Sequence, residues 1–200
     1  MCHAFLSDSR FYRFLFRIDQ EIAAEVQASG CCFCGGVLHS ARYPRKPRGF
    51  RSALSKNDYF RLSFCCASDD CRRRTTPPSV RFLGRKVYLG VSVVLTSALE
   101  HGLSRQRREQ LIDALNVPEQ TLWRWQCWWR EVFGEGPWWR MQRAGFVPPV
   151  AACKLPGELL GRLDGADLRE RVVRLLWLIA PLTTTSWSGS LRGVPNPQSL

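Results

Sequence analysis

Apolar residues recur every three or four positions from Arg10 to Ser29, while most charged residues lie off that stripe. Ser7 or Ser9 would cap the start of a helix here, because a serine hydroxyl accepts a hydrogen bond from a free backbone N–H group. Gly30 would end it, since glycine adopts the left-handed conformation common after a helix. The pattern predicts an N-terminal amphipathic helix within residues 1–30, with its apolar stripe facing a core.

Between residues 31 and 86 the pattern changes to that of short strands. Apolar and polar residues alternate over Phe60–Phe64, and Val37–Tyr43 and Val80–Leu83 have the composition of strands. Prolines and a glycine within Pro44–Gly49 interrupt regular structure. This part of the chain therefore predicts a small antiparallel sheet.

The rest of the chain is mainly helical in pattern. Four segments have apolar residues at spacings of three and four: Val87–Glu100, Arg105–Leu115, Glu119–Phe133 and Asp167–Ile179. The Trp- and Pro-rich segment Pro137–Pro149 is typical of an irregular linker. Thr183–Leu200 is typical of a disordered tail, because it is rich in Ser, Thr, Gly and Pro.

Composition indicates a folded protein that does not enter a membrane. Of the 200 residues, 45% are hydrophobic. The longest apolar stretch, Val87–Leu99, is shorter than the roughly 18 residues expected of a membrane span. The first residues lack the basic region and apolar run of a secretory signal. We therefore expect a cytoplasmic protein.

The positive charge is concentrated in one segment. The formal net charge is +12, and residues 41–86 contain 13 basic and three acidic residues, a net of +10. Most of the basic residues are arginines, whose planar guanidinium holds phosphate by paired hydrogen bonds. Such a cluster is typical of nucleic-acid binding, although a basic surface can also simply keep a protein soluble.

Two pairs of cysteines lie on either side of this basic segment. Cys31 and Cys34 are separated by two residues and followed by two glycines, which allow a tight turn. Cys71 pairs with Cys66, or with Cys65 in its place. Four thiolates satisfy the tetrahedral coordination of structural zinc, so Cys31, Cys34, Cys66 and Cys71 are the candidate ligands of Zn²⁺. The 31 residues between the pairs exceed the roughly 15–20 of a compact four-cysteine site.

Other uses of the cysteines compete with zinc. Disulfides are not expected in a chain of this length without a secretory signal. A redox dithiol of Cys31 and Cys34 would be expected between a strand and a helix, whereas here a helix precedes it and a basic loop follows. Cys127 and Cys153 are expected to be inert buried thiols.

The segment Leu111–Trp125 has the features of two helices joined by a tight turn. Asn116 tolerates the left-handed conformation, Val117 would fill the gap between the helices, and Pro118 suits a helix start. Leu122, Trp125 and Trp129 share one face and are expected in the core. The pattern predicts a helix-turn-helix, with Val87–Glu100 as its supporting helix; an ordinary helical hairpin is the alternative.

Two sets of residues are expected to contact double-stranded DNA. The basic segment would hold phosphates through Arg45, Lys46, Arg48, Arg72, Arg73 and Arg74. The second helix of a helix-turn-helix enters the major groove, and its candidate contacts are Glu119, Gln120, Thr121, Trp123 and Arg124. Gln120 can read adenine and Arg124 guanine by paired hydrogen bonds, while Thr121 would hold a phosphate.

The cysteine pairs followed by the turn and helix Asn116–Trp125 resemble the N-terminal DNA-binding half of bacterial insertion-sequence transposases and the small regulators of such elements. The resemblance covers residues 31–133 and implies recognition of element-end DNA. The long gap between the pairs and the N-terminal helix depart from that pattern. No succession of strands surrounds the carboxylates after Phe133, so we expect no catalytic domain and no enzyme activity. A separate transposase or recombinase subunit would then be a partner.

The expected fold class is α+β and mainly helical: a small zinc-ribbon-like sheet, a three-helix helix-turn-helix and a C-terminal helix. The expected boundaries are 1–30, 31–86, 87–136, 137–182 and 183–200. Two other functions stay open. The segment Trp123–Trp139 could dock a partner protein on a scaffold, or the CxxC pair could act in thiol redox chemistry.

Overall fold

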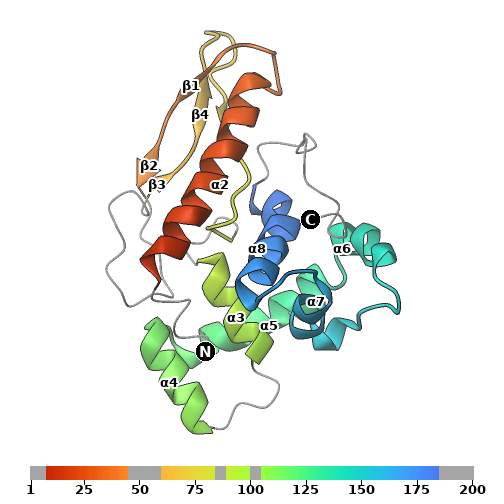
Figure 1. Ribbon diagram of the computed structural model, residues 1–200. Helices are drawn as coiled ribbons and strands as arrows, with labels where there is room; N and C mark the ends of the chain where they lie inside the picture. The colour runs from red at the N-terminus through yellow and green to blue at the C-terminus, as the bar shows by residue number, and fades with distance from the viewer. Residues whose placement is uncertain (1–7, 45–59, 84–88, 100–104, 185–200) are drawn as a thin grey trace.

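The computed structural model describes residues 8–44, 60–83, 89–99 and 105–184. The fold is α+β, as the sequence predicts, with helices forming most of the molecule and a small antiparallel sheet at one end (Figure 1). The predicted phosphate contacts Arg45, Lys46 and Arg48 lie outside the described residues, as do Ser7 and residues 185–200 of the expected tail.

Helix α2 (Ser9–Ala28) confirms the predicted N-terminal helix. Its cap is Asp8 rather than a serine, because the Oδ1 atom of Asp8 accepts hydrogen bonds from the backbone N–H groups of Arg10 at 2.8 Å and Phe11 at 3.3 Å. The backbone turns after the helix at Gly30, whose φ is +74°. This turn directs the chain into the first cysteine pair.

Five short strands follow within the described residues. They are β1 (Leu38–Ser40), β2 (Tyr43–Pro44), β3 (Phe60–Arg61), β4 (Phe64–Cys66) and β5 (Arg74–Thr75). Strands β1, β4 and β5 form an antiparallel sheet in the order β1-β4-β5, and β2 pairs with β3. Each of the two longer strands expected around residues 37–43 and 60–64 is therefore broken in two.

The strand predicted over Val80–Leu83 is absent from the described chain, where only Phe82 forms an isolated bridge with Leu89. The reason is that this segment is bound to helix α2 instead. The backbone N–H of Val80 donates to Oδ1 of Asp19 at 2.8 Å, so it is not offered to a neighbouring strand.

Helices form the remainder of the molecule. They are α3 (Gly90–Leu99), α4 (Arg105–Leu115), α5 (Glu119–Cys127), α6 (Pro137–Gln142), α7 (Gly157–Arg162) and α8 (Leu168–Ile179). Helix α5 continues as the π-helical turn η2 (Trp128–Phe133), so together they span the predicted third helix. Asp167 caps α8, because its Oδ1 atom accepts from the N–H of Glu170 at 2.9 Å. Helix α6 lies where an irregular linker was expected.

Helix α2 contributes residues to three hydrophobic clusters, the smallest of which joins Tyr12 to Phe82 and Leu89. Its N-terminal half packs with the helices through Phe11, Leu15, Ile18 and Ile22. Its C-terminal half packs on the sheet in a second cluster of Ala23, Val26, Cys31, Leu38, Leu62, Phe64 and Cys66. Figure 1 shows α2 lying alongside the β1–β4 strands, with its N-terminal end beside α3. The helix thus attaches the sheet to the helical body.

A buried ion pair ties α2 to the segment after the sheet. Asp19 and Arg81 are 2% exposed each, and Nε of Arg81 lies 2.8 Å from Oδ2 of Asp19. Ser79 Oγ also donates to Oδ2 at 2.7 Å. Arg61 is buried too and donates to the carbonyl of Pro77 at 2.6 Å. Arg61 and Arg81 are two of the 13 basic residues counted between residues 41 and 86, and both serve the interior rather than a basic surface.

None of the helices within the described ranges is long and apolar enough to span a membrane.

Candidate metal centre and adjacent surfaces

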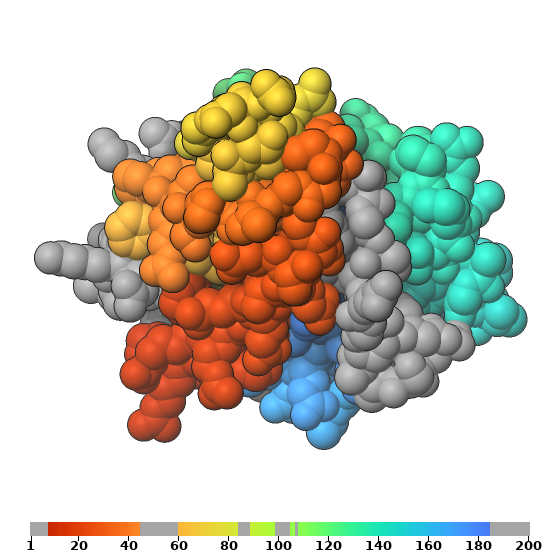
Figure 2. All heavy atoms as spheres, turned by 90° about the horizontal axis from the view of Figure 1, so that it is seen from above, coloured from red at the N-terminus to blue at the C-terminus, as the bar shows by residue number. Residues whose placement is uncertain are grey.

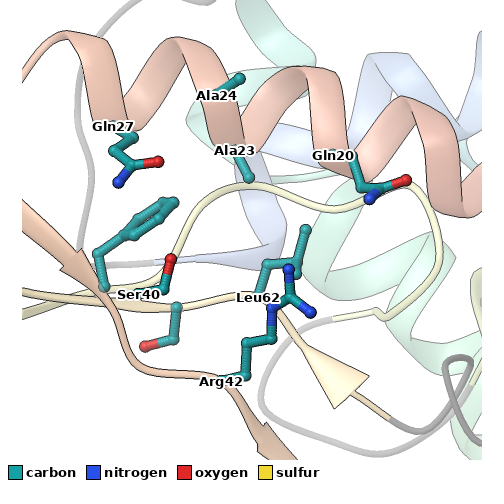
Figure 3. Close-up of a pocket in the computed structure, with 9 residues that line it drawn as sticks. Gln20, Ala23, Ala24, Gln27, Ser40, Arg42 and Leu62 are labelled. Carbon is teal, nitrogen blue, oxygen red and sulfur yellow. The ribbon is translucent and has the colours of Figure 1, made fainter.

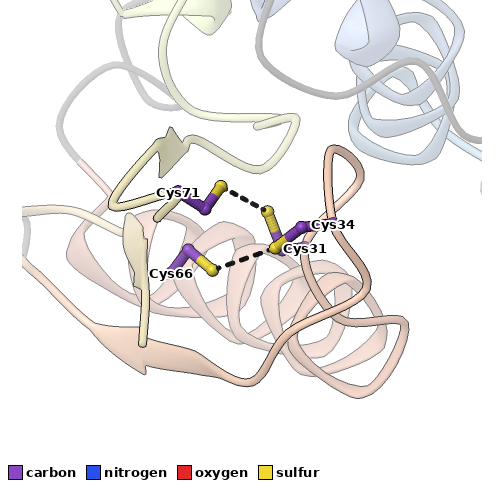
Figure 4. Close-up of side chains that lie close together, drawn as sticks. All are labelled: Cys31, Cys34, Cys66 and Cys71. Atoms are coloured by element: carbon purple, nitrogen blue, oxygen red, sulfur yellow. Dashed lines mark hydrogen bonds between the residues drawn. The ribbon is translucent and has the colours of Figure 1, made fainter. Parts of the chain in front are cut away.

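Four cysteine side chains converge at the end of the sheet. The Sγ atoms of Cys31, Cys34, Cys66 and Cys71 all lie within 4.8 Å of one another. The Cys31 and Cys71 sulfurs are 3.7 Å apart, and those of Cys34 and Cys66 are 3.4 Å apart. Figure 4 shows the four side chains pointing toward one another from two separate stretches of chain. The predicted ligand set is therefore brought together and can hold a metal ion.

The first stretch, Cys31–Gly36, is a tight turn that we call the first knuckle. The N–H of Gly35 donates to the carbonyl of Cys31 at 2.7 Å, and the N–H of Cys31 donates to the carbonyl of Gly36 at 2.9 Å. Gly35 has a φ of +73°, which explains the glycine after the second cysteine. A Cβ on Gly36 would lie 3.2 Å from the Cys66 sulfur, so this glycine leaves room for the cluster.

The second stretch, Cys66–Arg73, repeats the same turn and is the second knuckle. The N–H of Arg72 donates to the carbonyl of Ser68 at 3.0 Å, and the N–H of Cys66 donates to the carbonyl of Arg73 at 2.9 Å. Arg72, directly after Cys71, has a φ of +45°, matching Gly35 after Cys34. In the first knuckle the accepting carbonyl belongs to the first cysteine, whereas here it belongs to Ser68, two residues after Cys66. This difference accommodates the longer spacing from Cys66 to Cys71. Both knuckles present two sulfurs to the same point.

Each sulfur faces a backbone N–H two residues further along the chain. The donors belong to Phe33, Gly36, Ser68 and Arg73. The Phe33 N–H lowers the pKa of Cys31 to about 7. In the other three cysteines the donor also lowers the pKa, but burial and neighbouring thiols outweigh it, so each pKa is raised. The backbone N–H donors stabilise the thiolate form of each cysteine. Four thiolates this close together would repel one another unless a cation lay among them.

The choice between Cys65 and Cys66 is decided by the strand. Side chains alternate across β4, so Cys66 is buried in the cluster while Cys65 lies on the other face, with its Sγ 3.5 Å from the carbonyl of Arg72. Cys32 is exposed beside the cluster and, like Cys127 and Cys153, is not a member. Contrary to expectation, Cys153 is exposed and Cys127 only half-buried.

The three arginines that follow Cys71, at the end of the second knuckle and the start of β5, are exposed and engaged with neighbours. Arg72 forms an ion pair with Asp69. The guanidinium of Arg73 lies over the ring of Phe33 at 4.4 Å, and that of Arg74 over the ring of Tyr43 at 5.6 Å. Phe33 and Tyr43 have no local pattern that indicates this contact, since only the pairing of distant segments brings each ring to an arginine.

Helices α4 and α5 meet at the predicted turn. Asn116 has a φ of +49°, Val117 is buried, and Pro118 lies directly before the first residue of α5. The residues expected in the core, Leu122, Trp125 and Trp129, are all buried. On α5 the exposed positions are Glu119, Gln120, Trp123 and Arg124, and Glu119 lies 3.4 Å from Arg108 in an ion pair. Thr121 is buried at 5% exposure, so its hydroxyl is not available to a phosphate.

Most of the aromatic side chains after Trp123 belong to the interior. Trp129 and Trp139 are at most 1% exposed. Their rings contact Phe133 between them, with centroids 5.0 Å and 5.3 Å from the Phe133 ring. The Trp-rich segment therefore mainly supports the core, and Trp123, 61% exposed, is the exception.

A small cavity lies between α2 and the sheet. Its volume is about 140 Å³, and polar side chains of Gln20, Gln27, Ser40 and Arg42 line it (Figure 3). Gln27 is already engaged, since its Nε2 atom donates to the carbonyl of Leu38 at 3.0 Å. This volume is below the roughly 300–1,000 Å³ of most small-molecule sites. The cavity is therefore a surface recess rather than a substrate pocket.

No protein-family model, curated protein or solved structure matches this chain. Function must therefore be inferred from the cysteine cluster and the side chains around it.

Proposed function

We propose that this protein is a zinc-stabilised DNA-binding protein without a catalytic domain of its own, similar to a transposase DNA-binding region or a mobile-element regulator. The observation that carries the proposal is the convergence of four sulfurs within 4.8 Å on two matching knuckles. Sulfurs at the vertices of a tetrahedron around zinc lie about 3.8 Å apart, given Zn–S bonds of about 2.3 Å. The separations of 3.7 Å and 3.4 Å are close to that value.

Four protein ligands leave no open coordination position, so the zinc would be structural. The sheet it would stabilise has strands of only two or three residues. Such a sheet contributes little stability by itself, and metal binding would supply folding free energy. The result is a rigid platform next to Arg72–Arg74.

DNA reading is proposed for helices α4 and α5 as a helix-turn-helix. Support comes from the left-handed Asn116, the buried Val117 and the exposed side chains at the start of α5. Gln120 and Arg124 would contact base edges, and Trp123 can contact a thymine methyl group. Thr121 is left out of the proposal because it is buried. Any catalytic step would be performed by a separate transposase or recombinase subunit.

The two alternatives are less well supported. A redox dithiol needs two cysteines, whereas here four converge. A docking surface built on tryptophans needs exposed rings, whereas Trp125, Trp129 and Trp139 are buried. Zinc-dependent DNA binding explains more of the observed side-chain positions than either of these two alternatives does.

The decisive experiment measures zinc content and DNA affinity on the same sample. We expect about one zinc per chain and an affinity for duplex DNA that falls steeply between about 50 and 200 mM salt, because counterions are released on binding. A metal-free chain that cycles a disulfide would support redox chemistry instead. Zinc binding without salt-dependent DNA binding would favour the scaffold function.

A further inference from the structure

Phe33 and Arg73 form a stacked pair that the cysteine cluster holds in place. Phe33 lies two residues after Cys31, and Arg73 lies two residues after Cys71. The backbone N–H of each faces the sulfur of its cysteine, and those two sulfurs are 3.7 Å apart. Their side chains then meet outside the cluster, with the guanidinium 4.4 Å from the ring centroid.

A second arginine–ring pair joins β5 to β2. Arg74 follows Arg73 directly and stacks over Tyr43 at 5.6 Å. Figure 2 shows the segments around residues 31–44 (orange) and 65–80 (yellow) side by side on one face of the molecule. The surface consists of two arginine–ring pairs, Phe33 with Arg73 and Tyr43 with Arg74, carried by the knuckles and the adjoining strands.

This surface exposes more apolar area than a solvated charged surface requires. Phe33 is 51% exposed and the nearby Val37 is 68% exposed. Arg72 is engaged by Asp69, whereas Arg73 and Arg74 face aromatic rings. Positive charge beside accessible aromatic rings is complementary to a nucleotide, which has a flat base and a phosphate.

We propose that this surface binds unpaired nucleotides of single-stranded DNA, with Phe33 and Tyr43 stacking on bases and Arg73 and Arg74 holding phosphates. In a duplex the faces of the bases are covered by their neighbours, and only edges and phosphates are accessible. An aromatic ring can stack on a base only where the strand is unpaired. In the proposed function, α5 binds duplex DNA. This inference adds a second binding surface, next to the sheet, whose ligand is single-stranded DNA.

The test compares a labelled 20-nucleotide oligothymidylate with a 20-base-pair duplex by fluorescence anisotropy, using the full zinc-loaded chain. Phe33→Leu and Tyr43→Leu should each weaken oligothymidylate binding about 5- to 150-fold, the range expected for loss of one stacked base. Duplex binding should change less than twofold. Phe14→Leu, which removes an exposed ring on α2, should leave oligothymidylate binding unchanged.

Zinc content is measured for every variant, so that a misfolded knuckle is recognised. Undetectable oligothymidylate binding by the unaltered chain would overturn the proposal, as would unchanged binding by both zinc-loaded ring variants. Equal losses of affinity for single strand and duplex would show that the surface contacts phosphates and does not stack on bases. Tighter binding of oligouridylate than of oligothymidylate would show that its ligand is RNA rather than DNA. Absence of duplex binding with intact single-strand binding would contradict the proposed function but not this inference.

Discussion

At the scale of single residues, Cys65 and Cys66 have different roles although they are adjacent. Cys66 lies in the four-sulfur cluster, while the Cys65 sulfur lies near the carbonyl of Arg72 on the other face of β4. We predict that Cys66→Ser lowers bound zinc well below one per chain and lowers the Tm. Cys65→Ser should keep both unchanged. Metal analysis and thermal unfolding check this, and equal behaviour of the two variants would contradict the ligand assignment.

Gly36 is the second residue whose identity the cluster requires. A Cβ here would lie 3.2 Å from the Cys66 sulfur and 3.3 Å from the Cys34 sulfur. A bound metal prevents these sulfurs from moving away, so Gly36→Val should weaken zinc binding by about 1–3 kcal/mol, a typical cost of overpacking. Chelator competition measures the change. Gly161→Ala is the control, since nothing lies within 4 Å of its added Cβ; a similar loss there would indicate a general effect of glycine replacement.

At the scale of elements, the buried ion pair between Asp19 and Arg81 holds α2 against the segment after the sheet. Asp19 accepts hydrogen bonds from Val80, Ser79 and Arg81. Removing one partner leaves a buried charge alone, so Asp19→Ala should lower the free energy of unfolding by about 3–5 kcal/mol. Denaturant unfolding measures this. Glu109→Ala, which breaks an exposed pair with Arg105, should have little effect, and comparable losses would contradict the assigned difference.

Helix α5 and the second knuckle are expected to divide the work of DNA binding. Arg124 is exposed on α5 and would read a base, so Arg124→Ala should reduce discrimination at one base pair by about 1–3 kcal/mol. Arg73→Ala should weaken all duplex sequences to a similar extent and reduce the salt dependence. Binding to a set of sequences selected from random DNA measures both. Equal effects of Arg124→Ala and Arg73→Ala would contradict this division between base reading and phosphate binding.

At the scale of the whole molecule, the two larger hydrophobic clusters of the described residues differ in how far they depend on the candidate metal site. The cluster beneath the sheet contains Cys31 and Cys66, whereas the larger helical cluster contains no candidate ligand. Removal of metal by a chelator should therefore loosen the sheet while the helical body stays folded. Hydrogen exchange should increase over residues 31–40 and 64–75 and stay slow in α8. Cooperative loss of protection throughout the chain would show that α2 couples the two clusters too tightly for partial unfolding.

Local patterns were sufficient for much of this structure. Helix α4 has the predicted bounds, and Asn116 has the predicted left-handed backbone. Of the two acidic residues that the sequence offers as a cap for α8, Asp164 and Asp167, the structure uses Asp167. Each depends on neighbours within a few residues, which propensity and capping describe well. The predictions of two longer strands and of an irregular linker were wrong. Hydrogen bonds to side chains and the packing of distant segments, rather than local pattern, shortened the strands and formed helix α6.

The sequence alone determined the helical periodicity, the turn before α5 and the candidate ligand pairs, since these follow from residue type and short spacing. Tertiary structure decided that Cys66 rather than Cys65 joins the cluster, that Arg61 and Arg81 serve the interior, and that Phe33 meets Arg73. The physical reason is that burial and contact depend on which distant segments pack together. Charge and hydropathy along the chain are the same whether an arginine faces water or a buried carboxylate.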